Sequence, residues 1–278
     1  MKRLFARKPQ HDQADRLRDL VREKASSQKK PTDRRGVAMT GPPLIVLAGA
    51  KGGVGVTTLT LKLAKRLGSQ GRAVLAVDGN TRQTGLAELA GVEAGGVTTR
   101  EVLAGKARAV DALAPAGSGV WVMPGARVTP DRPEPGADHG AGVVRVAAHL
   151  RGVVEVVLLD AGSGLSPFAA PLWQAASETL LVTTPERLSL LGAYASLKLA
   201  SRLDPRPRVT LLPNRVRSLS DATRIHATVG GACQQFLGHG ATAAGFVGEG
   251  LYEDHTVALA DRNAERLLPS RSPDRAAA

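Results

Sequence analysis

The glycine-rich segment Gly49–Thr58 (GAKGGVGVTT) has the residue types and spacing of a phosphate-binding loop. Gly52, Gly53 and Gly55 allow the backbone to curl, so that successive N–H groups point inward at anionic oxygens. Thr57 lies where a hydroxyl would bind Mg²⁺. Because an apolar run precedes the segment and helical spacing follows it, the positive end of that helix would face the same anion. The pattern therefore predicts a nucleotide phosphate site.

One position of this segment departs from the GxxxxGK[ST] pattern. Where the pattern places a lysine on the β- and γ-phosphates, this chain has Val56, although an earlier lysine, Lys51, is present. A unit charge about 4 Å from a phosphate contributes roughly 4 kcal/mol at an effective dielectric constant near 20. Without that charge, we expect ATP or ADP with Mg²⁺ to bind weakly or not at all. We interpret Lys62 and Lys65 as surface charges, and Arg82 is the alternative replacement for the missing lysine.

The segments around this loop alternate between short apolar runs and stretches of helical spacing. This alternation predicts an α/β fold, with a mostly parallel sheet and helices on both faces. The expected strands are residues 44–49, 73–79, 120–125, 154–160, 179–184, 209–214 and 243–248. The expected helices are residues 57–67, 99–103, 142–150, 167–176, 187–203, 221–237 and 255–268. Such sheets bind ligands at the carboxyl ends of their strands, which is where the glycine-rich segment lies.

The N-terminal region differs in composition from the rest of the chain. By count, residues 1–36 hold 12 Lys/Arg and 5 Asp/Glu, hence +7 of the total net charge of +12. Within it, Ala14, Leu17 and Val21 have the spacing of a short amphipathic helix, which a Ser/Gln/Lys/Pro-rich tether follows. The predicted organisation is a basic tail with this helix at 1–36, a linker at 37–43, a P-loop domain at 44–268 and a disordered tail at 269–278.

The early lysine in KGGVG resembles the deviant Walker A motif of the MinD/ParA family of P-loop ATPases. The resemblance implies a MinD/ParA-like fold and a nucleotide-dependent homodimer in which Lys51 reaches the partner's nucleotide. Residues 77–80 (VDGN) look like the family's motif with two aspartates. Asp78 is the first of these, whereas the second, which positions the attacking water, is replaced by Asn80. Residues 157–162 (VLLDAG) are similar to the Walker B strand, and Asp160 is the carboxylate that would hold Mg²⁺ and water.

The resemblance also assigns roles to individual residues. The catalytic positions would be Lys51, Asn80 and Asp160, and the metal ligands would be Thr57, Asp78 and Asp160. The nucleotide would contact Gly52, Gly53, Val54, Gly55, Val56, Thr57 and Thr58, together with Asn214 and Arg215 in a segment that resembles the one touching adenine. Since an amide can orient water but accepts protons poorly, Asn80 adds to the loss at Val56. We expect ATP hydrolysis to be slow or absent.

The N-terminal helix narrows the resemblance to the FlhG branch, whose members regulate flagellar number and placement. Residues 12–18 (DQADRLR) are similar to the DQAxxLR motif by which FlhG proteins engage and stimulate the SRP-type GTPase FlhF. The residues expected to bind that partner are Asp12, Gln13, Ala14, Leu17 and Arg18. Further partners implied by the resemblance are a flagellar transcription activator and the basal-body switch proteins.

Composition limits the other functions open to the chain. Because Cys233 is the only cysteine, neither an intramolecular disulfide nor a cysteine metal cluster can form. Aromatic residues make up 3% of the chain, and we do not expect nucleic acid as a partner. No apolar run approaches the about 20 residues of a membrane span, and the N-terminus lacks the apolar region of a secretory signal. We expect a cytoplasmic protein, with at most peripheral contact at the inner face of the cell membrane near the flagellar base.

Two rival hypotheses stay open at the level of sequence. The first is an active MinD/ParA-type ATPase that positions cargo or partitions DNA by cycling between a monomer and an ATP dimer. Val56 and Asn80 argue against it, and a turnover assay decides. The second is an accessory factor of cellulose or capsule export, against which the DQADRLR segment argues.

Overall fold

The described part of the chain builds an eight-stranded sheet with the strand order β3-β4-β2-β5-β1-β6-β7-β8. The strands are β1 (Leu44–Gly49), β2 (Val74–Asp78), β3 (Ala114–Gly117), β4 (Val120–Met123), β5 (Val156–Ser163), β6 (Glu178–Thr183), β7 (Val209–Pro213) and β8 (Thr242–Ala243). β3 runs antiparallel to β4, and the other neighbouring pairs are parallel. The predicted α/β fold with a mostly parallel sheet is confirmed.

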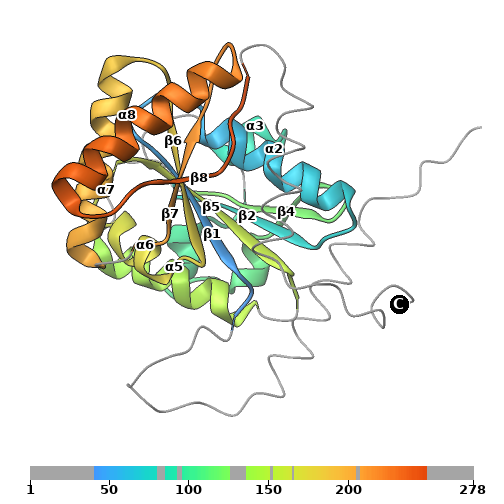
Figure 1. Cartoon of the computed structure of the whole chain (residues 1–278). Helices are drawn as coiled ribbons and strands as arrows, with labels where there is room; N and C mark the ends of the chain where they lie inside the picture. Colours follow the sequence, from blue (N-terminus) through green and yellow to red (C-terminus); the bar gives the residue numbers. More distant parts are fainter. Residues whose placement is uncertain are drawn as a thin grey trace, which may run out of the picture.

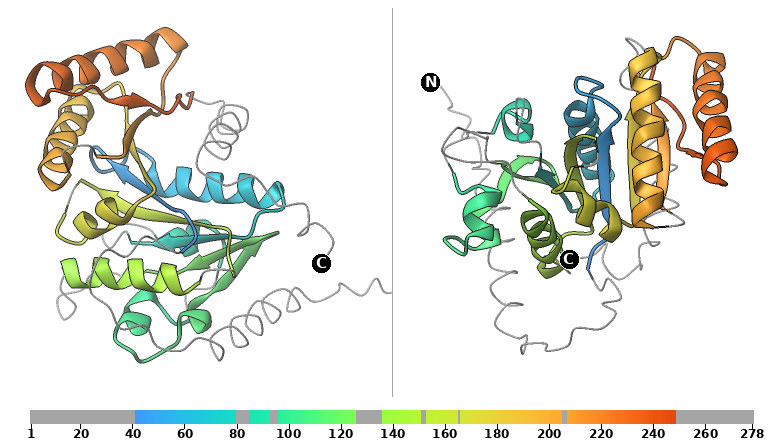
Figure 2. Two further views of the ribbon diagram at one scale, coloured as in Figure 1. Left: turned by 60° about the horizontal axis from the view of Figure 1, so that its bottom comes forward. Right: turned by 90° about the vertical axis from the view of Figure 1, so that its left-hand side faces the viewer.

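Helices connect these strands and cover the sheet. They are α2 (Val56–Ser69), α3 (Leu86–Leu89), α4 (Thr99–Leu103), α5 (Ala137–His149), α6 (Ala169–Ala175), α7 (Arg187–Leu203) and α8 (Leu219–Leu237), with a 3₁₀ helix, η1 (Ala109–Ala112). One apolar core joins the sheet to α5, α6, α7 and α8, and a second joins it to α2 and α3. Figures 1 and 2 show α2 and α5 on opposite faces of the sheet.

This computed structural model describes residues 41–79, 85–92, 96–125, 136–150, 153–164, 166–204 and 207–248. The predicted tails, the helix at 255–268 and the candidate residues Asn80 and Arg82 lie outside these described residues, as do all the predicted partner-binding positions in the N-terminal helix. Among the described helices, none is both long and apolar enough to span a membrane.

The glycine-rich loop follows β1, a strand that is fixed in the middle of the sheet. It lies between β5 and β6 in the middle of the sheet, and all six of its residues are buried. Since helices cover both faces, its sequence is apolar throughout rather than alternating. The backbone N–H of Ala50 still donates to the carbonyl oxygen of Val182 at 2.8 Å, so the chain leaves the sheet only after that residue.

Several predicted boundaries are confirmed and a few are wrong. The helices at 99–103 and 187–203 have the predicted ends, and the apolar runs up to residue 214 all contain strands. The predicted strand at 243–248 is wrong over most of its length, because β8 ends at Ala243 and Gly245 then adopts a φ of 101°. The helix predicted from residue 142 begins at Ala137 instead. Sequence patterns missed α3, η1 and β3, since elements of four residues are too short to show periodicity.

Candidate nucleotide-binding site

Residues 50–55 form a tight loop between β1 and α2. Gly53 and Gly55 have φ angles of 75° and 97°, a left-handed conformation that favours glycine. Helix α2 begins directly afterwards, and Gly55 at its N-cap offers no side chain to bind the first backbone N–H groups. Those donors therefore face the loop, where an anion can accept hydrogen bonds from them. The backbone has the shape of a phosphate cradle, as the sequence predicted.

Val56 contributes no charge to this cradle because its side chain belongs to the core. Only 7% of the residue is exposed, and it packs in the same cluster as Ile45, Leu47 and Leu59. It also lies against β1: a Cβ added at Gly49 would be 3.0 Å from a Val56 methyl group. The loop thus keeps its form around an apolar side chain, and its backbone N–H groups are what it offers to a phosphate at this position.

The first half of the loop is held by the start of α7. Lys51 forms an ion pair with Glu186, the residue just before that helix. Gly192 lies so close to the loop that an added Cβ would overlap the carbonyl oxygen of Ala50. Neither Glu186 nor Gly192 was singled out from sequence, because their contact with the loop depends on how β6 and α7 pack beside β1.

The turn after β7 holds the second half of the loop. The Asn214 side-chain amide donates to the carbonyl oxygen of Val54 at 2.7 Å, and Asn214 is 4% exposed. Its side-chain oxygen accepts the backbone N–H of Arg215 at 2.9 Å, and Arg215 has a φ of 56°. The structure thus brings Asn214 and Arg215 to the phosphate loop. Asn214 supports the loop directly, while its predicted contact with a base stays a prediction.

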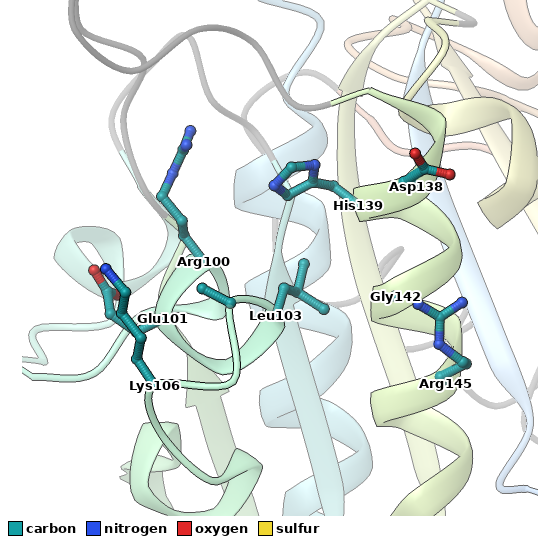
Figure 3. A pocket seen from close by; sticks show the side chains of 9 residues that line it. Arg100, Glu101, Leu103, Lys106, Asp138, His139, Gly142 and Arg145 are labelled. Atoms are coloured by element: carbon teal, nitrogen blue, oxygen red, sulfur yellow. The ribbon is translucent and has the colours of Figure 1, made fainter.

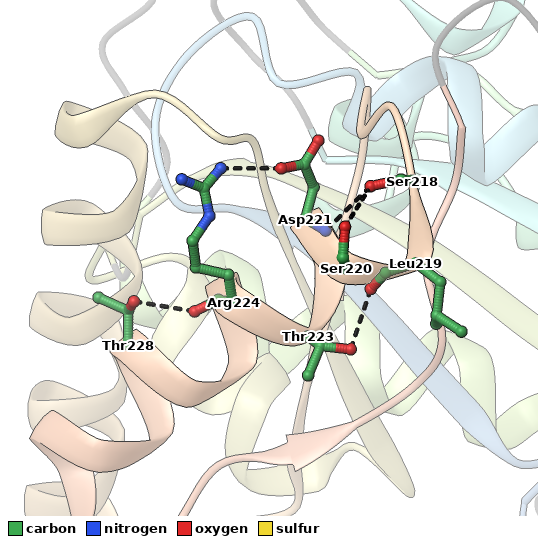
Figure 4. Close-up of polar contacts among 7 residues, drawn as sticks. All are labelled: Ser218, Leu219, Ser220, Asp221, Thr223, Arg224 and Thr228. Carbon is green, nitrogen blue, oxygen red and sulfur yellow. Dashed lines mark hydrogen bonds and ion pairs between the residues drawn. The ribbon is translucent and has the colours of Figure 1, made fainter.

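Helix α8 starts shortly after this turn and so limits the conformations that the turn can adopt. The Ser218 hydroxyl accepts the backbone N–H of Asp221 at 3.2 Å and so caps the helix (Figure 4). Arg224 pairs with the Asp221 carboxylate at 2.8 Å, one turn further along. This cap explains why the helix begins at Leu219 rather than at the predicted residue 221.

A pocket of about 260 Å³ opens between α2 and the Asn214 turn. It is lined by Gly55, Thr58, Leu59, Lys62, Asn214 and Arg215. Lys62, interpreted from the sequence as a surface charge, is half-buried and lines this pocket, whereas Lys65 is exposed. The spacing of Gly55, Thr58 and Lys62 is the signal that could have found this, because residues three and seven apart share one face of a helix.

Two carboxylates stand at the ends of neighbouring strands, next to the loop. Asp160 at β5 is fully buried, and its Oδ1 accepts the backbone N–H of Gly162 at 2.9 Å. Burial raises the pKa of Asp160, while the Thr57 hydroxyl and the Gly162 N–H oppose that shift. Asp78 is its direct neighbour in the register of β2 and β5. The Asp78 Oδ2 accepts the backbone N–H of Leu86 at 2.7 Å, at the start of α3.

The surroundings of Asp160 fit Mg²⁺. Its Oδ2 is buried without a hydrogen-bond partner of ordinary geometry, and the Thr57 hydroxyl lies close enough to affect its pKa. No group of three or more metal-binding side chains occurs among the described residues. Mg²⁺ does not need one, because it commonly uses one or two carboxylates together with phosphate oxygens and waters. The roles of Thr57, Asp78 and Asp160 as metal ligands remain predictions.

A second hollow, of about 470 Å³, lies between α4 and α5 (Figure 3). Arg100 and Lys106 line it from the α4 side, and His139 and Arg145 line it from α5. Residues of the phosphate loop and of the Asn214 turn do not contribute to its lining. It is therefore separate from the candidate nucleotide site.

Comparison with known proteins identifies the family to which this site belongs. Residues 45–261 match the family described as the CobQ/CobB/MinD/ParA nucleotide binding domain. The chain belongs to this family. Among curated proteins, the antiactivator FleN of Pseudomonas aeruginosa, a FlhG homologue, is 27% identical over 194 residues, which is 70% of this chain and 69% of FleN.

Solved structures of MinD/ParA-family members have the same fold. The cell division ATPase MinD of Pyrococcus furiosus superposes with a TM-score of 0.65 at 23% identity, covering 81% of this chain and 99% of that one. MinD from Pyrococcus horikoshii, in a complex with Mg-ADP, gives a TM-score of 0.62 at 25% identity, covering 78% of this chain and 86% of that one. The resemblance to the MinD/ParA family is confirmed.

Proposed function

We propose that this MinD/ParA-family protein is an FlhG-like regulator of flagellar number and placement with a degenerate nucleotide site. The observation that carries the proposal is the burial of Val56 in the core beneath a loop that keeps the shape of a phosphate cradle. A regulator needs the domain and its surfaces, whereas an ATPase also needs the ammonium group at this position. The similarity to FleN, an antiactivator, supports a regulatory role.

Slow hydrolysis follows from what the remaining residues offer. Mg²⁺ with ATP or ADP would be held by the backbone N–H groups of the loop and by Thr57 and Asp160, where the metal would neutralise phosphate charge. Stabilisation of charge on the transferring phosphoryl group ordinarily also requires a positioned lysine. Val56 cannot supply it, and Lys51 pairs with Glu186 in this chain. We expect turnover of ATP at the background rate.

The proposed output of the protein is stimulation of the FlhF GTPase by its N-terminal helix. The motif at residues 12–18 lies in the basic N-terminal segment of the sequence. A Ser/Gln/Lys/Pro-rich stretch, which we predict to be a tether, separates the motif from the domain. The remaining proposed partners, a flagellar transcription activator and the basal-body switch proteins, would meet the domain itself. A homodimer that depends on nucleotide is also part of the proposal, by its likeness to MinD.

Stimulation of FlhF can be tested with the purified full-length protein. GTP hydrolysis by FlhF is measured with the full chain, with a variant lacking residues 1–30, and with Gln13→Ala. Gln10→Ala is the matched control, because it removes the same side chain two residues before the motif. We expect stimulation by the full chain and by Gln10→Ala only. Equal stimulation by all four proteins would remove the flagellar assignment.

Hydrolysis by the protein itself is a separate measurement. We expect phosphate release from ATP and Mg²⁺ to be the same for the full chain and for Asp160→Ala. Magnesium-dependent release that disappears in Asp160→Ala would instead support the rival hypothesis of an active positioning ATPase.

A further inference from the structure

The strongest unassigned feature is the outward face of α7. Of the seven large apolar side chains that are exposed in the described part of the chain, four are leucines of this helix. Leu188 and Leu191 are 71% and 56% exposed, and Leu199 and Leu203 are 40% and 38% exposed. Together with the exposed Ala195, they recur at intervals of three or four residues and so form one stripe along the helix. Figure 1 shows α7 along the outer edge of the molecule.

The inward face of α7 shows that these leucines do not serve the core. Its buried residues are mostly small, namely Ser189, Ala193, Ser196 and Ala200, and Leu197 is the one large side chain among them. A surface helix ordinarily has the opposite arrangement, with its large apolar side chains toward the core and polar ones outward. Because contiguous exposed apolar side chains mark interaction sites, the stripe is a surface that another molecule covers.

A row of cations follows one edge of this leucine stripe. Arg187, Lys198 and Arg202 are exposed, and their spacings of eleven and four residues bring them to the same side of the helix. The helix itself contains no acidic residue, and the nearest ones in sequence, Glu186 and Asp204, lie just outside its two ends. The covering surface must therefore combine an apolar layer with negative charge.

We infer that α7 is a membrane-docking surface, which lies on a bilayer that contains anionic phospholipids. The leucines enter the boundary between headgroups and acyl chains, and the neighbouring cations stay at the level of the lipid phosphates. The inference goes beyond the proposed regulatory function and does not depend on it.

Other occupants fit this face less well. Protein interfaces are rich in aromatic side chains, and leucine is under-represented among the residues that carry their binding energy, whereas the stripe consists of leucines and one alanine. A second copy of this chain is disfavoured by charge, because two antiparallel copies of α7 would bring their rows of cations together along a shared edge.

Binding of the full-length protein to lipid vesicles tests this inference. Sedimentation is measured with vesicles of phosphatidylcholine alone and of equal parts phosphatidylcholine and phosphatidylglycerol. We expect binding to the anionic vesicles. Leu191→Gln should weaken it by about tenfold through lost apolar burial, and Lys198→Gln by about fivefold through one lost cation near the surface. Leu89→Gln on α3 and Lys65→Gln on α2 are the matched controls, since each removes an exposed residue of the same type elsewhere, and both should bind like the natural protein.

Tryptophan fluorescence shows whether α7 itself meets the lipid. The two natural tryptophans, Trp121 and Trp173, are buried, so a tryptophan introduced at an exposed position reports its own surroundings. We expect the emission of Leu191→Trp to shift to shorter wavelength with anionic vesicles, and that of Leu89→Trp to stay unchanged. Thermal unfolding of each variant shows whether its fold is intact.

Three results would overturn the inference. The first is a natural protein that does not bind anionic vesicles. The second is equal binding by Leu191→Gln and Leu89→Gln with no shift for Leu191→Trp, which would assign membrane attachment to another segment. The third is a dimer, detected by light scattering, that Leu191→Gln dissociates while vesicles stay unbound, because the stripe would then be an interface between copies. None of these results would change the expected stimulation of FlhF.

Discussion

The phosphate loop and the Asn214 turn are neighbouring pieces of left-handed backbone with different chemistry. The loop takes its shape from the left-handed residues Gly53 and Gly55. Its Val56 side chain packs in the core, and its Lys51 side chain forms an ion pair with Glu186. The turn has a left-handed residue with a cationic side chain, Arg215, which is one of the residues that line the pocket. The difference teaches that the shape and the charge of a phosphate site are separable. Backbone geometry can persist after the charge that usually accompanies it is gone.

The largest expected effect comes from returning the charge to the loop. Val56→Lys should tighten ATP binding by about a hundredfold, because an ammonium near the β- and γ-phosphates is worth a few kcal/mol. It should also increase the preference for ATP over AMP. Calorimetric titration measures both, and Val56→Met is the control for a long but uncharged side chain. If the lysine and methionine variants bind ATP alike, missing charge is not what distinguishes the loop from the turn.

A smaller effect is expected when the shape of the loop is changed instead. Gly192→Ala puts a methyl group against the carbonyl of Ala50, which is backbone and must shift. Such overpacking should lower the free energy of unfolding by about 2 kcal/mol. Gly231→Ala is the matched control on α8, since a Cβ there meets nothing within 4 Å and alanine favours a helix. Urea denaturation of the two variants compares them, and equal stabilities would mean that α7 does not support the loop.

The smallest expected effect concerns Asp160 and depends on pH. Because burial raises its pKa above the ordinary value of 3.8, the ionised carboxylate destabilises the folded protein at neutral pH. Asp160→Asn should therefore raise the free energy of unfolding by about 1 kcal/mol near pH 7, the scale of one unsatisfied buried group. As pH falls through the raised pKa toward 3.8, the wild-type carboxylate takes up its proton and the advantage of the variant disappears.

Thermal or urea unfolding of both proteins at about pH 7 and about pH 4.5 measures this difference. An Asn variant that is less stable at neutral pH would show that nearby donors, such as the Gly162 N–H, outweigh the cost of burial. In that case the Asp160 carboxylate would already be electrostatically satisfied without a metal.

Much of the architecture could be predicted because it depends on local patterns. Buried parallel strands read as continuous apolar runs, and the long helix α7 shows its period clearly, so both were placed correctly. The short elements α3, η1 and β3 could not be found, since four residues are not enough to show a period. The last strand is shorter than predicted, and Gly245, two residues after its end, has a left-handed φ of 101° that residue type alone does not predict.

The sequence by itself determined the family, the position of the loop and the absence of its lysine, because these depend on residue type and spacing. Only the tertiary structure decided where the neighbouring charges lie. It buried Val56 in the core, paired Lys51 with Glu186 and placed Lys62, Asn214 and Arg215 around one pocket. These contacts join elements that are distant in the chain. They follow from the order of β1, β6 and β7 in the sheet, which no local pattern encodes.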